Sequence, residues 1–92
     1  MAKKAGKVVS GEFSTEKAVK EKKAKLVIVA NNASNNTKKL FTNKTEFYNI
    51  PLRFYSDKEN LGHGIGCEIR TSVAILDEGF ANAIIKKIDE IN

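Results

Sequence analysis

Cysteine, histidine, proline and tryptophan are nearly missing from this 92-residue chain, which has one Cys, one His, one Pro and no Trp. A single thiol, Cys67, has no second cysteine with which to form an internal disulfide or a cysteine-rich zinc site. We therefore expect no disulfide scaffold, no structural zinc and no cofactor.

Long hydrophobic runs are missing too. The longest one, Leu26 to Ala30, has five residues, whereas a membrane-spanning helix needs roughly 20. The N-terminal lysines are not followed by the apolar segment of a secretory signal. These absences predict a cytoplasmic protein without a membrane partner.

The chain does have enough apolar material for one small core, and its charge is unevenly distributed. A hydrophobic fraction of 41% suits one compact domain, which we expect over residues 6–92 after a flexible basic tail at residues 1–5. Residues 1–53 hold twelve Lys or Arg against four Glu, a net charge of +8, whereas residues 54–92 hold four against seven acids, a net charge of −3. This asymmetry favours a polyanion at one face, with solvated lysines that serve only solubility as the alternative.

Short apolar segments alternate with amphipathic ones along the chain. Strands are expected at residues 7–9, 26–30, 52–55 and 72–76. The second of these is apolar throughout, which is typical of a strand covered on both faces. The alternation predicts a three-layer α/β/α sandwich with a central mixed sheet of about four strands.

The amphipathic segments between these strands are expected to be helices. Their expected N-caps are Ser14, Ser34 or Asn35, Ser56 or Asp57, and Asp77 or Glu78. The first helix is expected to run through Lys22, the third over residues 58–65 and the last from Gly79. Each is too short to be stable alone in water, so buried side chains must hold it. The side chains expected to do this are Phe41, Phe47, Phe80, Ile84, Ile85 and Ile88.

Catalytic sites find little support in the sequence. His63 and Cys67 are four residues apart and could pair as base and nucleophile, but no third group is evident to orient them. Residues 62–67 superficially resemble a dinucleotide-binding loop, yet the third glycine of that motif falls on Cys67. A small nucleotide-handling enzyme is therefore only the third hypothesis, and we expect a protein without enzymatic activity.

A binding site finds better support, from three polar segments expected at one end of the sheet. These are residues 11–17, 31–35 and 67–71. A helix N-terminus near Ser14 offers free N–H groups and a positive dipole to phosphate. Lys17 and Lys20, three residues apart on one helix, can approach the same nucleic-acid backbone. The amides of Asn31 and Asn32 suit base edges, and turn formation is an equally good explanation for both.

Six pieces of the sequence have a distinctive order and spacing. They are Gly11, Lys17 to Val19, Lys25 to Ala30, Ile50-Pro51, Leu61-Gly62 with Gly66, and Ser72 to Ile75. Together they resemble the kink-turn RNA-binding ribosomal proteins of the L-seven-Ae and L-thirty-e type, over about residues 7–88. Residues 33–39 and 76–81 most resemble the bacterial YlxQ-like branch of that family.

The resemblance implies an α/β/α sandwich that binds a sharply bent RNA with sheared G·A pairs. In the family, a Gly-x-Asn-Glu-x-x-Lys signature at the start of the first long helix reads those guanines. Gly11 and Lys17 match this signature, whereas Phe13 and Ser14 replace the Asn and the Glu. Phe13 can only stack or pack, and Ser14 offers one short hydrogen-bonding group.

A second loop of the family covers a flipped-out nucleotide and corresponds here to residues 67–71. The resemblance therefore adds Glu68, Ile69, Arg70 and Thr71 to the expected RNA site, with Ile69 against an extruded base and Arg70 on a phosphate. The resulting hypothesis is a monomeric, ribosome-associated protein that binds ribosomal, kink-turn-like or other structured RNA. The alternative is a protein-interaction module on the same fold with weak or non-specific RNA binding.

Overall fold

A computed structural model describes residues 7–55 and 71–91 of the chain. The helices and strands of this part are, in chain order, β1 (Val8–Ser10), α1 (Glu12–Lys20), β2 (Leu26–Val29), α2 (Asn35–Tyr48), β3 (Leu52–Phe54), β4 (Ser72–Ile75) and α4 (Glu78–Ile91). The predicted helix at residues 58–65, its caps Ser56 and Asp57, and the pair His63 and Cys67 lie outside the described residues.

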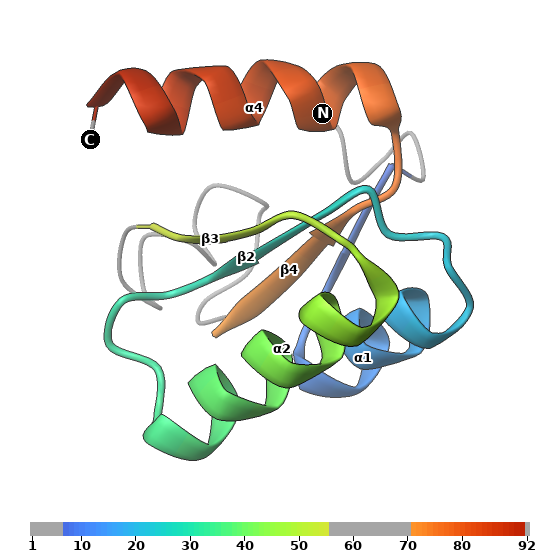
Figure 1. Ribbon diagram of the computed structural model, residues 1–92, viewed down its shortest axis with the longest axis vertical. Helices are drawn as coiled ribbons and strands as arrows, with labels where there is room; N and C mark the ends of the chain where they lie inside the picture. Colours follow the sequence, from blue (N-terminus) through green and yellow to red (C-terminus); the bar gives the residue numbers. More distant parts are fainter. Residues whose placement is uncertain (1–6, 56–70, 92) are drawn as a thin grey trace.

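The four strands form one mixed sheet in the order β1-β4-β2-β3. β4 is antiparallel to both of its neighbours, and β2 is parallel to β3, with Val27 opposite Leu52 and Val29 opposite Phe54. Figure 1 shows α4 above the sheet and α1 and α2 below it. The predicted three-layer α/β/α sandwich with a mixed sheet of about four strands is confirmed.

Each face of the sheet has its own apolar core because β2 alternates its side chains between them. Val27 and Val29 pack with Val19 of α1 and Phe41 of α2, between the sheet and these two helices. On the other face, Leu26 and Ile28 pack with Val8, Val73, Ile75, Ala81 and Ile88, and α4 covers them. All four β2 residues are buried, so the prediction of a strand covered on both faces is confirmed.

Helix α1 begins two residues before the sequence-based cap, and the prediction that Ser14 caps it is wrong. Its N-cap is Gly11, which has φ 91°, and the N–H of Thr15 donates to the Gly11 carbonyl at 2.9 Å. Ser14 therefore lies within the first turn. Glycine is itself tolerated at an N-cap, and Glu12, an acid at the first helical position, interacts favourably with the helix dipole.

Helix α2 follows its predicted cap, since the Ser34 hydroxyl accepts the N–H of Thr37 at 3.2 Å. The predicted burial of Phe47 is wrong, because this side chain is 77% exposed. At 100° per residue, Phe47 lies about 240° around the helix from the buried Phe41. Thr45, one turn after Phe41, occupies the buried position, and its hydroxyl donates to the Phe41 carbonyl at 2.6 Å.

Helix α4 confirms Asp77 as one of its two expected caps, because the Phe80 N–H donates to Asp77 Oδ2 at 2.7 Å. Ile88 is buried, and Phe80, Ile84 and Ile85 are half-buried against the sheet. Among residues 7–55 and 71–91, no helix has the length and apolar character required to cross a bilayer.

Candidate functional site

One end of the sheet collects segments that are far apart in the sequence. β1, β2 and β3 end there, and β4 begins there. The Gly11 N–H donates to the Ser72 carbonyl at 2.9 Å, and the Ala30 N–H donates to the Thr71 carbonyl at 2.9 Å. We call this end, formed by residues 11–14, 30–34 and Thr71, the loop edge. Two of the predicted polar segments thus meet here with Thr71, the described residue of the third.

The α1 part of the loop edge presents backbone amides and an aromatic ring. The N–H of Thr15 donates to the Gly11 carbonyl and makes the first hydrogen bond of the helix. The N–H groups of residues 12–14 precede it and have no acceptor within the helix. Phe13 is 79% exposed and Ser14 is half-buried. Phe13 is therefore available for stacking on an external group, while its exposure excludes a role in the apolar core.

The β2–α2 part of the loop edge is a tight turn. The Ala33 N–H donates to the Ala30 carbonyl at 3.1 Å, which places Asn31 and Asn32 at the two central positions of that turn. Both asparagines are exposed. They therefore form a turn, which confirms one of the two sequence interpretations. Their polar side chains lie beside the start of α2.

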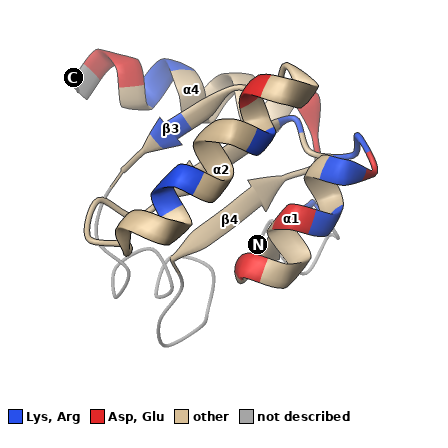
Figure 2. Ribbon diagram, turned by 60° about the horizontal axis from the view of Figure 1, so that its bottom comes forward, with Lys and Arg blue, Asp and Glu red and all other residues tan. Residues whose placement is uncertain are grey.

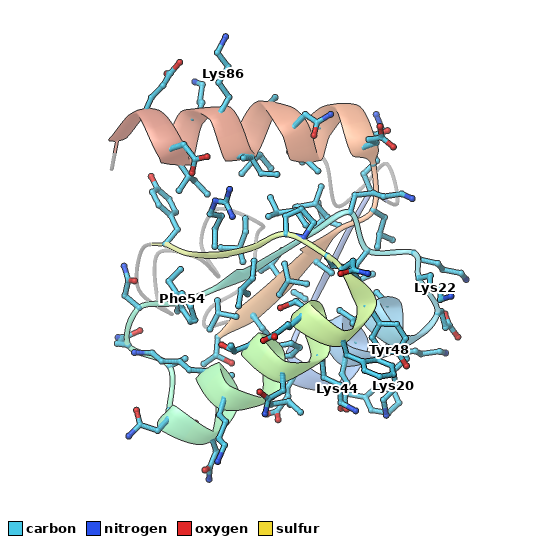
Figure 3. The ribbon with its side chains drawn as sticks, in the orientation of Figure 1. Lys20, Lys22, Lys44, Tyr48, Phe54 and Lys86 are labelled. Carbon is cyan, nitrogen blue, oxygen red and sulfur yellow. The ribbon has the colours of Figure 1, made fainter. Side chains whose placement is uncertain are left out.

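Lys17 and Lys20 have different surroundings despite being neighbours on α1. Lys17 is exposed in the second turn, and no acidic side chain of the described residues lies within ion-pair distance of it. Lys20 is the last residue of α1, and its Nζ lies 3.3 Å from Glu16 Oε2. Glu16 also lies 4.0 Å from the Nζ of Lys44 on α2. Lys20 thus belongs to a charge cluster at the opposite end of α1 from the loop edge (Figure 3).

The sequence interpretation missed several side chains near the loop edge. Phe54 and Tyr55 are exposed at the end of β3, where the Tyr55 N–H donates to the Val29 carbonyl at 3.0 Å. Lys38 and Lys39 stand in the first turns of α2, and Figure 2 shows basic residues in blue along that helix. A signal for all four existed, since the lysines closely follow the Ser34 cap and the aromatic residues end the predicted strand at residues 52–55.

The remaining predicted contacts are located only in part. Thr71 is half-buried, and its carbonyl ties the loop edge to β2. Glu68, Ile69 and Arg70 lie outside the described residues. Within residues 7–55 and 71–91, no three His, Cys, Asp or Glu side chains gather as a metal site would require.

The loop edge presents several kinds of polar and aromatic groups to solvent. It combines backbone N–H donors, side-chain amides and the exposed ring of Phe13 with further exposed aromatic and ammonium groups nearby. These groups can neutralise phosphates and stack on unpaired bases. Fold and site together define a small α/β/α sandwich domain with a polar and aromatic loop edge.

Comparison with known proteins identifies the family of this domain. The model of the ribosomal protein L7Ae/L30e/S12e/Gadd45 family matches residues 1–85, and the chain belongs to that family. The chain is 42% identical to the RNA-binding protein YlxQ of Bacillus subtilis over 89 residues, which cover 97% of this chain and 89% of that protein. It is 38% identical to the RNA-binding protein YlxQ of Enterococcus faecium over 81 residues, covering 88% and 78%. The predicted resemblance to the family and to its YlxQ-like branch is confirmed.

A solved structure agrees with the fold as well. A protein of unknown function from Bacillus halodurans C superposes with a TM-score of 0.91 at 32% sequence identity, over 96% of this chain and 89% of that one.

Proposed function

We propose that this protein binds structured RNA through the loop edge and does so without enzymatic activity. The observation that carries the proposal is the pair of hydrogen bonds that join Gly11 to Ser72 and Ala30 to Thr71. They bring the α1 start and the asparagine turn together at one end of the sheet. The names of two relatives, each an RNA-binding protein YlxQ, support the same function.

In this proposal each part of the loop edge, and Lys17 about one turn further along α1, has a role that its chemistry allows. The amides of residues 12–14 and the ammonium of Lys17 contact phosphates. Gly11 has φ 91°, and a Cβ added to it would meet no atom within 4 Å, so open space beside it lets the RNA backbone approach closely. Asn31 and Asn32 donate to and accept from base edges, and Phe13 stacks on an unpaired base.

The RNA that fits best is a bent one with unpaired or sheared bases, such as a kink-turn in ribosomal RNA. This assignment rests on the match of Gly11 and Lys17 to the family signature. The protein would then act in the cytoplasm, as a monomer, in association with the ribosome. The replacement of the signature Asn and Glu by Phe13 and Ser14 exchanges hydrogen-bonded readout for stacking.

A titration of the purified protein with a kink-turn RNA and with a straight duplex tests this proposal. We expect tighter binding to the kink-turn RNA and a steep loss of affinity between about 50 and 200 mM salt, because several phosphates are contacted. Lys17→Gln should lower the slope of log affinity against log salt by about one. Lys86→Gln is the matched control, since Lys86 is exposed on α4, across the sheet from α1 (Figure 3).

Equal affinity for the two RNAs would refute the recognition of a bent RNA. Equal effects of the two lysine substitutions would refute the loop edge as the contact surface. A double substitution, Phe13→Asn with Ser14→Glu, should increase the preference for the kink-turn RNA if the two signature positions contact it.

A protein-interaction module is the second candidate, and the exposure of Phe13 and Phe47 on the α1 and α2 layer favours it. Large apolar side chains on a surface are typical of protein interfaces. Salt separates the two functions, because an apolar interface loses little affinity over a range in which RNA binding collapses.

A further inference from the structure

The end of the molecule opposite the loop edge has a pocket of its own. The turn between α1 and β2 and the turn between α2 and β3 lie side by side there and line a solvent-open hollow of about 230 Å³. The lining residues that matter are Lys22, Lys25, Tyr48 and Asn49, with Ile50 and Pro51 at the base of β3. β2 separates the two ends, since Lys25 precedes it and Ala30 follows it, a span of about 17 Å at roughly 3.3 Å per residue.

Two lysines that line this pocket have no acidic partner among the described residues. Lys20 and Lys44 are each near Glu16, and Lys23 lies 3.4 Å from Glu21. Lys22 and Lys25, by contrast, have no acidic side chain of the described residues within ion-pair distance, and no acid is among the described residues that line the pocket. Two like charges beside one small cavity repel each other, and a bound anion relieves that repulsion.

The backbone at Lys22 has an unusual conformation for a lysine. Lys22 has φ 60°, a left-handed conformation that glycine normally supplies at a helix end. The equivalent residue at the end of α2 is Asn49, with φ 59°, and asparagine adopts this conformation more readily than lysine. A lysine therefore stands where glycine would avoid the strain. Its exposed ammonium interacts favourably with the partial negative charge of the α1 C-terminus, and it is also accessible to an anion in the pocket.

An aromatic platform completes the pocket. Tyr48 lines it and is half-buried against the core on the α1 and α2 side of the sheet. The rings of Phe47 and Tyr48 form a T-shaped pair, with centroids 4.9 Å apart and planes at 82°. Figure 3 shows Tyr48 and Lys22 at the same side of the molecule, with Lys20 and Lys44 below, and Phe54 at the other side. An aromatic ring next to such lysines is the combination that binds single-stranded nucleic acid, where the ring stacks on a base and the cations track the phosphates.

We propose that this pocket is a second site, which binds one nucleotide with its phosphate on Lys22 and Lys25 and its base on Tyr48. The volume is below the roughly 300–1,000 Å³ of pockets for drug-sized ligands, so the pocket has room to contact one nucleotide unit rather than several. The two helix C-termini at this end carry partial negative charge, so the lysines, rather than the helix dipoles, must supply the attraction for phosphate. The site is separate from the loop edge and does not depend on the function proposed for it.

Amide chemical shifts in a ¹⁵N-labelled sample test the proposal with three probes: a single-stranded RNA hexamer of mixed sequence, adenosine monophosphate and inorganic phosphate. We expect the hexamer to shift the amides of residues 22–25 and 49–50. If adenosine monophosphate causes the same shifts, a free nucleotide is enough to occupy the pocket. If only the hexamer causes them, the occupant is a nucleotide of an RNA strand. The absence of shifts with both overturns the proposal, and equal affinity for inorganic phosphate overturns the role of Tyr48.

Variants separate this site from a general attraction to positive charge. Lys22→Gly with Lys25→Gln should lower the affinity at the pocket about tenfold or more, whereas Lys23→Gln with Lys86→Gln removes the same charge and should leave it unchanged. Tyr48→Leu keeps an apolar side chain and should cost about fivefold or more through lost stacking. Equal effects of the two double variants overturn the site. Lys17→Gln should leave the pocket shifts unchanged, so failure of the loop edge and failure of the pocket are read separately.

Discussion

Replacement of Lys22 by glycine should make the protein more stable, because of the way α1 ends. The Lys22 N–H donates to the Val19 carbonyl at 3.0 Å and the Lys23 N–H donates to the Ala18 carbonyl at 2.9 Å, a Schellman arrangement that needs a left-handed residue at position 22. These hydrogen bonds use only backbone atoms. Glycine therefore keeps both of them and removes the steric conflict of the lysine Cβ.

The expected gain is the difference between two opposing terms. The left-handed conformation costs a residue with a Cβ about 1–2 kcal/mol. Glycine has more freedom to lose on folding, which costs about 0.5–1 kcal/mol. Lys22→Gly should therefore raise the free energy of unfolding by about 0.5–1 kcal/mol, or the Tm by about 2–8 °C for a domain of this size.

Lys23→Gly is the matched control, because Lys23 is the next residue and has no positive φ. It removes the same side chain but relieves no strain, so it should lower the free energy of unfolding by about 0.5–1 kcal/mol. Its ion pair with Glu21 is a surface pair and adds little. Thermal and urea unfolding followed by circular dichroism measures both variants. If both lower the stability to the same extent, the account of the α1 end is refuted.

Four further substitutions test the rest of the fold. Phe41→Ala, at a fully buried position, should lower the free energy of unfolding by about 3–5 kcal/mol. Phe47→Ala should lower it by no more than about 1 kcal/mol, mainly through the lost ring contact with Tyr48. Similar losses for both variants in urea unfolding would contradict the assigned faces of α2. Asp77→Ala removes the α4 cap and should cost about 0.5–2 kcal/mol, and an unchanged Tm would contradict that cap. Gly11→Ala meets no atom within 4 Å, so its cost of about 1–3 kcal/mol should come from φ alone, and a stability equal to that of the parent protein would contradict this conformation.

The alternation of strands and helices was readable from the sequence because it depends on local patterns. The apolar residues of β2, the Ser34 cap and the Ile88 stripe of α4 each follow from the chemistry of near neighbours in the chain. The family could also be recognised, since pieces such as Lys25 to Ala30 keep their order and spacing. Errors arose where a residue type has two local uses, as with Ser14, which can cap a helix or lie within its first turn.

The assembly of the sites depended on contacts that no local pattern encodes. Phe47 and Phe41 have the same hydrophobicity, and only the packing of α2 on the sheet decided which one is buried. Likewise, the spacing of Glu16 and Lys20 in the sequence is that of a helical ion pair, but only the packing of α2 against α1 brings Lys44 to the same carboxylate.

The sequence by itself determined the order of the elements, the apolar alternation of β2 and the family to which the chain belongs. Only the tertiary structure decided which of its exposed groups stand together. The loop edge exists because strand pairing joins Gly11 to Ser72 and Ala30 to Thr71, and the pocket beside Lys22 and Tyr48 exists because two turns about 25 residues apart meet at the other end. Both depend on long-range pairing, whose geometry is set by the sheet as a whole rather than by neighbouring residues.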